Sequence, residues 1–176
     1  MHQKRRGAPI APRLSLGKED FMERIASFTV DHERLTKGMY VSRVDGDVVT
    51  YDIRMKKPNG GNYLGNGELH TIEHLFATFA RNSCFRKSVL YVGPMGCRTG
   101  FYLLMRDDVT GEEAIGLVRD SFAFIRDFEG VIPGSTAKEC GNYREHDLPA
   151  ARKTAEDMLG ILEGWTEEKL SYDYGK

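Results

Sequence analysis

Alternation of apolar and polar residues is clearest between Asp47 and Lys56. One side of an extended chain there carries four apolar residues, and the residues between them fall on the other side: Val49, Tyr51, Ile53 and Met55. This period of two predicts a strand with one face in the core. Shorter extended segments are predicted at Ser27–Val30, Ser88–Val92 and Thr99–Met105, the last two separated by a turn at residues 93–96.

Three other segments have helical spacing. The first begins near Gly67 and runs through residues 68–82. The second begins at Thr110, which forms a capping box with Glu113, and the third begins at Asp147, an N-cap residue. Apolar stripes follow both caps: Ile115, Val118, Phe122 and Ile125, then Ala151, Ala155, Met158, Leu159 and Leu162. The order of elements predicts an α+β fold, a largely antiparallel sheet with helices on one face.

Composition narrows the class of protein. The chain has 176 residues and a net charge of −1, and its pI is near 6.5, so its overall charge favours neither nucleic acid nor an anionic membrane. Residues 22–176 are expected to form one domain behind a flexible extension, residues 1–21; a nucleic-acid-binding arm is the alternative for its basic cluster, Lys4 to Arg6. No apolar run reaches the roughly 20 residues of a membrane span, and no signal peptide is recognised, which predicts a cytoplasmic protein.

The strongest chemical signal is the sequence His70-Thr71-Ile72-Glu73-His74. Residues four apart share one face of a helix, so both imidazoles can reach one metal ion, with Glu73 beside it. Two surface histidines with a solvated glutamate are the alternative. The same spacing also occurs in inverzincin peptidases, where the glutamate activates water.

Two histidines leave a metal short of ligands, and a cysteine thiolate is a suitable third. Cys140 and Cys97 are the candidates, each in a glycine-containing segment, although packing is an alternative for both. Cys84, just past the first predicted helix, is expected to be a packing residue. Two histidines and one thiolate would leave a position open for substrate, which is typical of a catalytic site.

Five segments, in order along residues 27–162, resemble the S-ribosylhomocysteine lyases (LuxS). They are Ser27–His32, Tyr51–Arg54 with Pro58-Asn59, His70–His74, Pro94–Tyr102 and Glu139–Gly141. The resemblance implies that His70, His74 and Cys140 bind one divalent metal, ferrous iron natively, with zinc or cobalt able to substitute. It also implies that Glu73 and Cys97 move protons while the carbonyl migrates along the ribose chain.

The resemblance further implies a cleavage that releases homocysteine and 4,5-dihydroxy-2,3-pentanedione, the precursor of autoinducer-2. Arg54 would help to hold the substrate. The family forms homodimers with two sites at the interface, so Ser27 and His32 would reach the partner's site. No nucleic acid or membrane partner is implied. A relative that binds metal without catalysis is the alternative, but ligation alone needs neither Glu73 nor Cys97.

Four positions carry further expectations. Arg54 could instead form an exposed ion pair with Asp52, and His32 could be an ordinary surface histidine. His146 is predicted to be a helix-start residue with no metal role. Tyr91 and Gly93 depart from the family, whose members commonly have an aspartate and a serine near these positions, so substrate affinity could differ.

Overall fold

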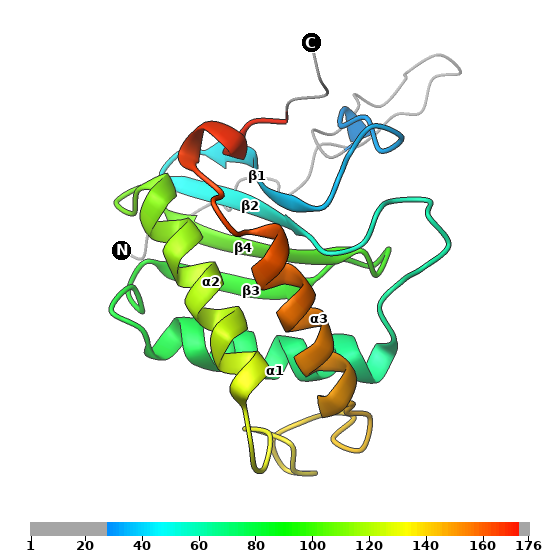
Figure 1. Cartoon of the computed structure of the whole chain (residues 1–176). Coiled ribbons are helices and arrows are strands. Elements are labelled where there is room, and N and C mark those ends of the chain that lie inside the picture. The colour runs from blue at the N-terminus through cyan, green and yellow to red at the C-terminus, as the bar shows by residue number, and fades with distance from the viewer. Residues whose placement is uncertain (1–27, 173–176) are drawn as a thin grey trace, which may run out of the picture.

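An antiparallel sheet with strand order β1-β2-β4-β3 forms one layer of the molecule (Figure 1). The computed structural model describes residues 28–172. The elements are β1 (Gly38–Asp45), β2 (Val48–Arg54), α1 (Asn66–Asn82), β3 (Val89–Pro94), β4 (Gly100–Arg106), α2 (Gly111–Asp127), α3 (Leu148–Ile161) and a short 3-10 helix, η2 (Glu167–Leu170). The predicted α+β class is confirmed. The predicted boundary between residues 21 and 22 lies outside the described residues.

The alternation in β2 is confirmed by its register in the sheet. Tyr51 and Ile53 are 2% and 0% exposed, and they pair with Leu103 and Phe101 of β4 on the same side. β1 was not predicted from the sequence. Its sequence, GMYVSRVD, is buried at one end and exposed at the other, so the apolar alternation that marks β2 is missing.

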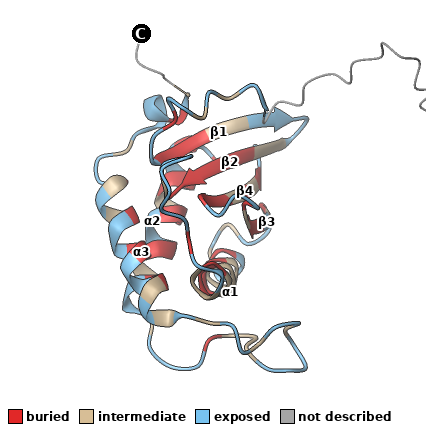
Figure 2. Cartoon of the chain, turned by 90° about the vertical axis from the view of Figure 1, so that its right-hand side faces the viewer, coloured by how far each residue is buried: buried red, intermediate tan, exposed pale blue. Residues whose placement is uncertain are grey.

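Helices α1, α2 and α3 cover one face of this sheet, and their buried residues lie on the side that faces it (Figures 1 and 2). The predicted caps are confirmed: the Thr110 N–H donates to the Glu113 carboxylate at 2.9 Å, and the Ala150 N–H donates to Asp147 at 3.0 Å. Phe76 of α1 lies between Phe122 of α2 and Phe101 of β4, with ring centroids 5.5 and 6.4 Å away. α1 is therefore fixed by the core on one side, and its other side is available for a site.

The opposite face of the sheet is polar and yet partly buried. Asp52 and Arg54 are each 2% exposed. They form the ion pair that the sequence suggested as an alternative, but its predicted exposure is wrong. The predicted strand at residues 27–30 is also wrong where it is described, since Phe28 to Val30 form turns. Directly after them the Asp31 carboxylate accepts the N–H groups of Glu33 and Arg34, which bends the chain further.

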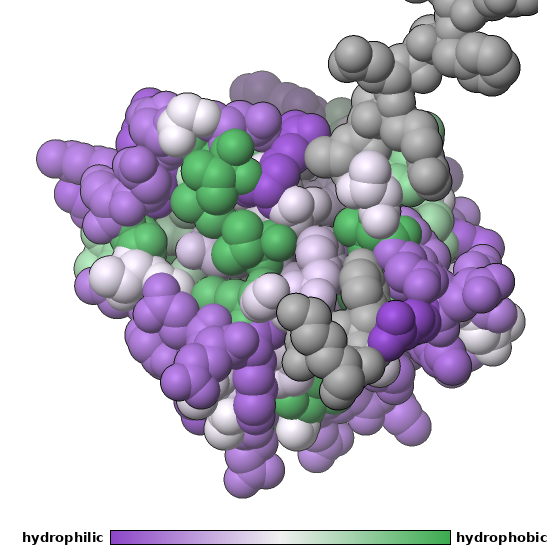
Figure 3. Space-filling view, turned by 90° about the horizontal axis from the view of Figure 1, so that it is seen from above, coloured by the Kyte–Doolittle hydropathy of each residue, from purple (hydrophilic) through white to green (hydrophobic). Residues whose placement is uncertain are grey.

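The surface carries some exposed apolar groups. Phe28, Val44 and Tyr91 are among the exposed large side chains, and the face seen from above gathers apolar residues between hydrophilic ones (Figure 3). Within residues 28–172, no helix has both the length and the apolar character that crossing a bilayer requires.

Candidate active site

Two histidines project from consecutive turns of α1. The rings of His70 and His74 lie 4.6 Å apart, and their planes are inclined at 82°. Both are half-buried, and with Glu73 and Cys140 they line a pocket of about 480 Å³. An imidazole nitrogen binds a metal ion that lies in the plane of its ring. Because the two ring planes are nearly perpendicular, they intersect along a line, and an ion on that line lies in both planes. Both histidines can therefore direct a nitrogen at one point.

The long connection between α2 and α3, residues 128–147, fixes how these rings are oriented. The Pro133 carbonyl accepts a hydrogen bond from Nδ1 of His74 at 2.7 Å, and the Glu145 carbonyl accepts one from Nδ1 of His70 at 2.9 Å. A carbonyl oxygen only accepts, so Nδ1 carries the hydrogen and Nε2 carries the lone pair in both rings. Gly134, with a φ of +74°, makes the turn beside His74.

Cys140 comes from the same connection and completes a group of donors. Its Sγ lies 3.2 Å from Nε2 of His70. One ligand atom from each of His70, His74, Cys140 and His146 lies within 4.8 Å of the others. Adjacent ligand atoms of a tetrahedral zinc-type site are about 3.6 Å apart, given usual metal–nitrogen and metal–sulfur bond lengths. The donor set thus fits a divalent transition metal, and the structure brings together the three residues that the sequence singled out.

His146 is predicted from the sequence to be a helix-start residue with no metal role. It does precede the N-cap of α3, but its ring stacks on His70 at 4.2 Å and lies 5.0 Å from His74. Burial lowers its pKa, which favours the neutral imidazole. No spacing in the sequence relates His146 to residues more than 70 positions earlier, so only the fold reveals this contact.

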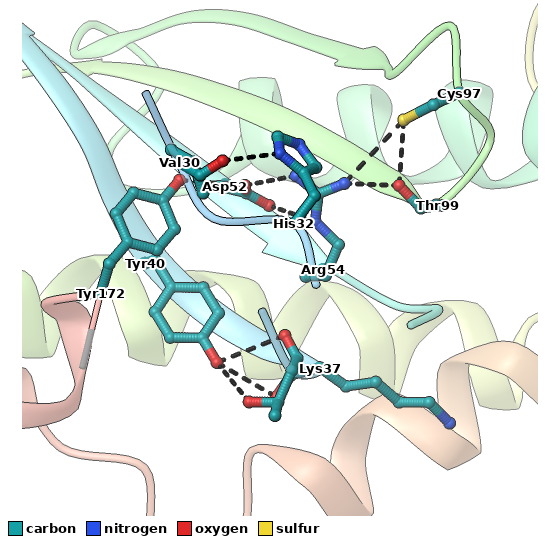
Figure 4. A network of polar contacts seen from close by, with 10 residues as sticks. Val30, His32, Lys37, Tyr40, Asp52, Arg54, Cys97, Thr99 and Tyr172 are labelled. Carbon is teal, nitrogen blue, oxygen red and sulfur yellow. Dashed lines mark hydrogen bonds and ion pairs between the residues drawn. The ribbon is translucent and has the colours of Figure 1, made fainter. Parts of the chain in front are cut away.

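Cys97 belongs to a second group, at the loop between β3 and β4 (Figure 4). This loop lies close against the end of β2: the Met55 N–H donates to the Thr99 carbonyl at 2.9 Å. A Cβ atom on Gly100 would lie 2.1 Å from the Ile53 carbonyl oxygen, so this approach requires glycine. The residue after Cys97, Arg98, has a φ of 57°, an uncommon conformation for a non-glycine residue. The exposed thiol is therefore set in a constrained turn.

Arg54 connects the thiol to a buried carboxylate. Its Nη1 donates to the Thr99 hydroxyl and lies 3.9 Å from Sγ of Cys97. Because the Thr99 oxygen accepts that bond, its own hydrogen is available to Sγ of Cys97, 3.0 Å away. Two donor groups thus face the sulfur.

The Arg54 guanidinium is held in place by Asp52. Nε and Nη2 donate to the two carboxylate oxygens at 3.1 and 2.6 Å. Burial acts to lower the pKa of Arg54, but the Asp52 charge and hydrogen bonds raise it more, so the net shift is upward. The Tyr172 hydroxyl donates to Asp52 at 3.0 Å, and burial followed by the Asp52 charge raises the pKa of this tyrosine. The C-terminal segment therefore closes this network, which the sequence did not indicate.

Other predicted site residues are less tightly placed. His32 is half-buried in the segment before β1, and its Nδ1 bonds the Val30 carbonyl at 2.9 Å. Ser27 lies outside the described residues. Among residues 28–172, the hydrogen bonds and ion pairs join Cys97 to Arg54 and Thr99, and none of them links this group to His70, His74 and Cys140.

Comparison with known proteins decides the family. The sequence model of S-Ribosylhomocysteinase (LuxS) matches residues 25–169. The chain belongs to the LuxS family. An S-ribosylhomocysteine lyase from Phocaeicola vulgatus is 50% identical over 157 residues, which cover 86% of this chain and 98% of the relative. One from Clostridium acetobutylicum is 47% identical over 156 residues, covering 86% and 99%. Membership in LuxS replaces the inverzincin alternative.

Tyr91 and Gly93, the positions expected to depart from the family, lie in close contact. A Cβ atom on Gly93 would lie 2.0 Å from the Tyr91 hydroxyl, so this placement of Tyr91 requires glycine at position 93. Tyr91, 50% exposed, lines a cavity of about 280 Å³ with Tyr102 and Arg43 on the sheet face opposite the helices. The tyrosine therefore occupies the space of the side chain that glycine lacks.

Replacing Cys140 by serine is expected to weaken Co²⁺ binding by more than about 100-fold. This loss is larger than that caused by replacing a residue that only hydrogen-bonds to a metal ligand. The physical reason is that serine removes the thiolate of the donor group. Titration of Co²⁺ into the metal-free protein measures this through the thiolate-to-cobalt absorption band, which should disappear. The Cys84→Ser variant is the matched control and should bind as the parent does. Equal binding by Cys140→Ser would exclude Cys140 as a ligand.

Replacing Asp52 by asparagine is expected to lower the free energy of unfolding by about 3–5 kcal/mol, because the Arg54 charge remains buried without its partner. Urea denaturation measures the change. Asp127→Asn is the control: it breaks the Arg126–Asp127 pair, which has similar bidentate geometry but lies in solvent. This substitution should leave the free energy of unfolding unchanged. Similar effects of the two substitutions would mean that burial of the Arg54 pair is unimportant.

Proposed function

We propose that the chain cleaves S-ribosylhomocysteine to homocysteine and 4,5-dihydroxy-2,3-pentanedione. The observation that carries this proposal is the pocket in which Glu73 stands beside His70, His74 and Cys140, in a chain of the LuxS family. Relatives named S-ribosylhomocysteine lyase are 45–50% identical over nearly their whole length. The reaction is a carbon–sulfur lyase reaction and needs no co-reactant.

His70, His74 and Cys140 would hold a divalent metal, which supplies Lewis acidity toward the sugar oxygens. Glu73 lies one residue before His74 and lines the same pocket, which supports a role in which its carboxylate takes a proton from a sugar carbon beside the carbonyl and returns it elsewhere. Repeated proton transfers of this kind move the carbonyl along the ribose chain.

Cys97 is the second proton carrier of the proposal. The residue is exposed, its sulfur faces two donor groups, from Arg54 and Thr99, and in the proposal it acts as the base. Once the carbonyl stands two carbons from the thioether carbon, removal of the proton between them forms a carbon–carbon double bond. The carbon–sulfur bond breaks, its electron pair leaves with the homocysteine sulfur, and that sulfur takes up a proton.

We also propose a homodimer in which Ser27 and His32 approach the partner's pocket and Arg54 helps to hold the substrate. The sheet face opposite the helices supports this, because Tyr91 is exposed there and lines a cavity together with Leu104 and Tyr102. The metal is proposed to be Fe²⁺, with Zn²⁺ or Co²⁺ able to replace it, since two imidazoles and a thiolate accept each of these ions. A cytoplasmic location and a product that serves as the autoinducer-2 precursor complete the proposal.

The direct test is release of free thiol from S-ribosylhomocysteine by the iron-loaded protein under anaerobic conditions. Glu73→Gln and Cys97→Ala should each lower kcat by at least about 100-fold, because each removes a proton carrier. Metal content should not change in either variant. The controls are Glu163→Gln and Cys84→Ala, which change an exposed glutamate and an exposed cysteine and should retain parental rates. A folded, metal-loaded parent that releases no thiol would favour the non-catalytic alternative.

The dimer is tested by sedimentation velocity. The parent should sediment with twice the chain mass of 19.9 kDa. Leu104→Glu puts a charge on the polar sheet face and should shift the protein toward monomer, whereas Val131→Glu, at an 84% exposed position after α2, should not. Circular dichroism shows whether both variants fold. A parent that is monomeric at micromolar concentration contradicts the dimer.

A further inference from the structure

His146 has a buried nitrogen with no partner among the described residues. Its Nε2 is enclosed and makes no hydrogen bond, although the ring lies beside two histidines of the metal group. A buried nitrogen without a partner is costly, so its position requires an explanation. The ring is either a fourth ligand or a support for the ligands.

Hydrogen bonds decide which nitrogen carries the hydrogen. The Thr71 hydroxyl lies 2.8 Å from the Gly67 carbonyl oxygen, and two oxygens this close need a hydrogen between them, so Thr71 donates there. The same oxygen accepts the Asp147 N–H at 2.9 Å. Its remaining lone pair faces Nδ1 of His146 at 3.3 Å. Nδ1 must therefore be the donor, which leaves the lone pair on Nε2.

Stacking argues against ligation by that lone pair. The rings of His70 and His146 are 4.2 Å apart and only 18° from parallel. A metal lies in the plane of its imidazole at about 2.1 Å from the nitrogen. Near-parallel rings in contact are separated by about 3.5 Å, so an ion in the plane of His70 stays too far out of the plane of His146. His74, at 82° to His70, has no such restriction.

Contacts from residues 145–147 hold His70 on two sides. The Glu145 carbonyl fixes the ring edge through Nδ1, and the His146 ring covers a face. The Asp147 N–H donates to the Gly67 carbonyl at 3.1 Å and to Thr71, which ties the same segment to the first turns of α1. His70 can then rotate little about its side-chain bonds.

We propose that His146 is a positioning residue that stays off the metal and fixes the His70 ring by stacking on it. The ring face is the feature that matters, so another flat aromatic side chain can replace it. The unpaired Nε2 lone pair is compensated by the positive charge of an ion held next to it by His70, His74 and Cys140. This inference deepens the metal site of the proposed function and does not depend on the substrate.

The test is Co²⁺ binding by the metal-free full chain, with His146→Ala and His146→Phe compared with the parent. His146→Ala removes the ring face and should weaken Co²⁺ binding by about 10–100-fold, the usual effect of losing a residue that supports a metal ligand. His146→Phe keeps the face and should restore affinity to within about fivefold of the parent, because the ring that stacks on His70 remains. The visible absorption of bound Co²⁺, which reports the ligand set, should be the same in all three proteins.

Each other result overturns the proposal. If His146 were a ligand, both variants would lose affinity alike and the cobalt spectrum would change. Equal affinity in all three proteins would mean that stacking does not position His70. Circular dichroism and urea denaturation of the metal-free proteins show that both variants fold. None of these readouts uses S-ribosylhomocysteine, so an inactive enzyme would contradict the proposed function and leave this test intact.

Discussion

The site depends on how residues 128–147 dock against the first turns of α1. This connection has no helix or strand of its own, yet it supplies the Pro133 and Glu145 carbonyls, the Cys140 sulfur and the His146 ring. A long connection of this kind is held by few backbone bonds, so its order depends on the groups that meet at the histidines. A bound ion would join Cys140 to α1 directly and stabilise the docked connection. Metal binding and ordering of this segment are therefore expected to be coupled.

Strand register separates the two chemical groups of the molecule. Tyr51 and Ile53 point into the core beneath the helices, while Asp52 and Arg54, one residue away, point to the other face. The side of the sheet that faces α1 therefore carries the metal group, and the far side carries the arginine that approaches Cys97. Substrate that contacts both groups would have to reach around the end of the sheet, where the β3–β4 loop lies. A partner subunit on the far face would enclose that path, which is why the dimer matters to the proposed chemistry.

Much of this arrangement could be predicted from local sequence, because its causes are local. The four-residue spacing of His70 and His74, the caps at Thr110 and Asp147 and the alternation in β2 each follow from the geometry of one element. β1 escaped prediction because only one end of the strand is buried. The pair with Asp52, which the sequence offered only as an exposed alternative for Arg54, is buried because residues far away in the chain, Tyr172 among them, cover it. His146 was set apart for the same reason, since its ring contact depends on how a loop folds back on α1.

Tyr91 and Gly93 are coupled by packing on the sheet face opposite the helices. The tyrosine hydroxyl occupies the space above Gly93, so this placement of the Tyr91 ring needs a residue without a Cβ atom at position 93. The result is an aromatic wall, made by Tyr91 and Tyr102, beside Arg43 on the sheet face. A positively charged group of a ligand that entered this cavity would meet a ring face there, which is a favourable contact. This aromatic wall lies on the sheet face that also carries Arg54, which approaches Cys97, whereas His70, His74 and Cys140 lie apart from it.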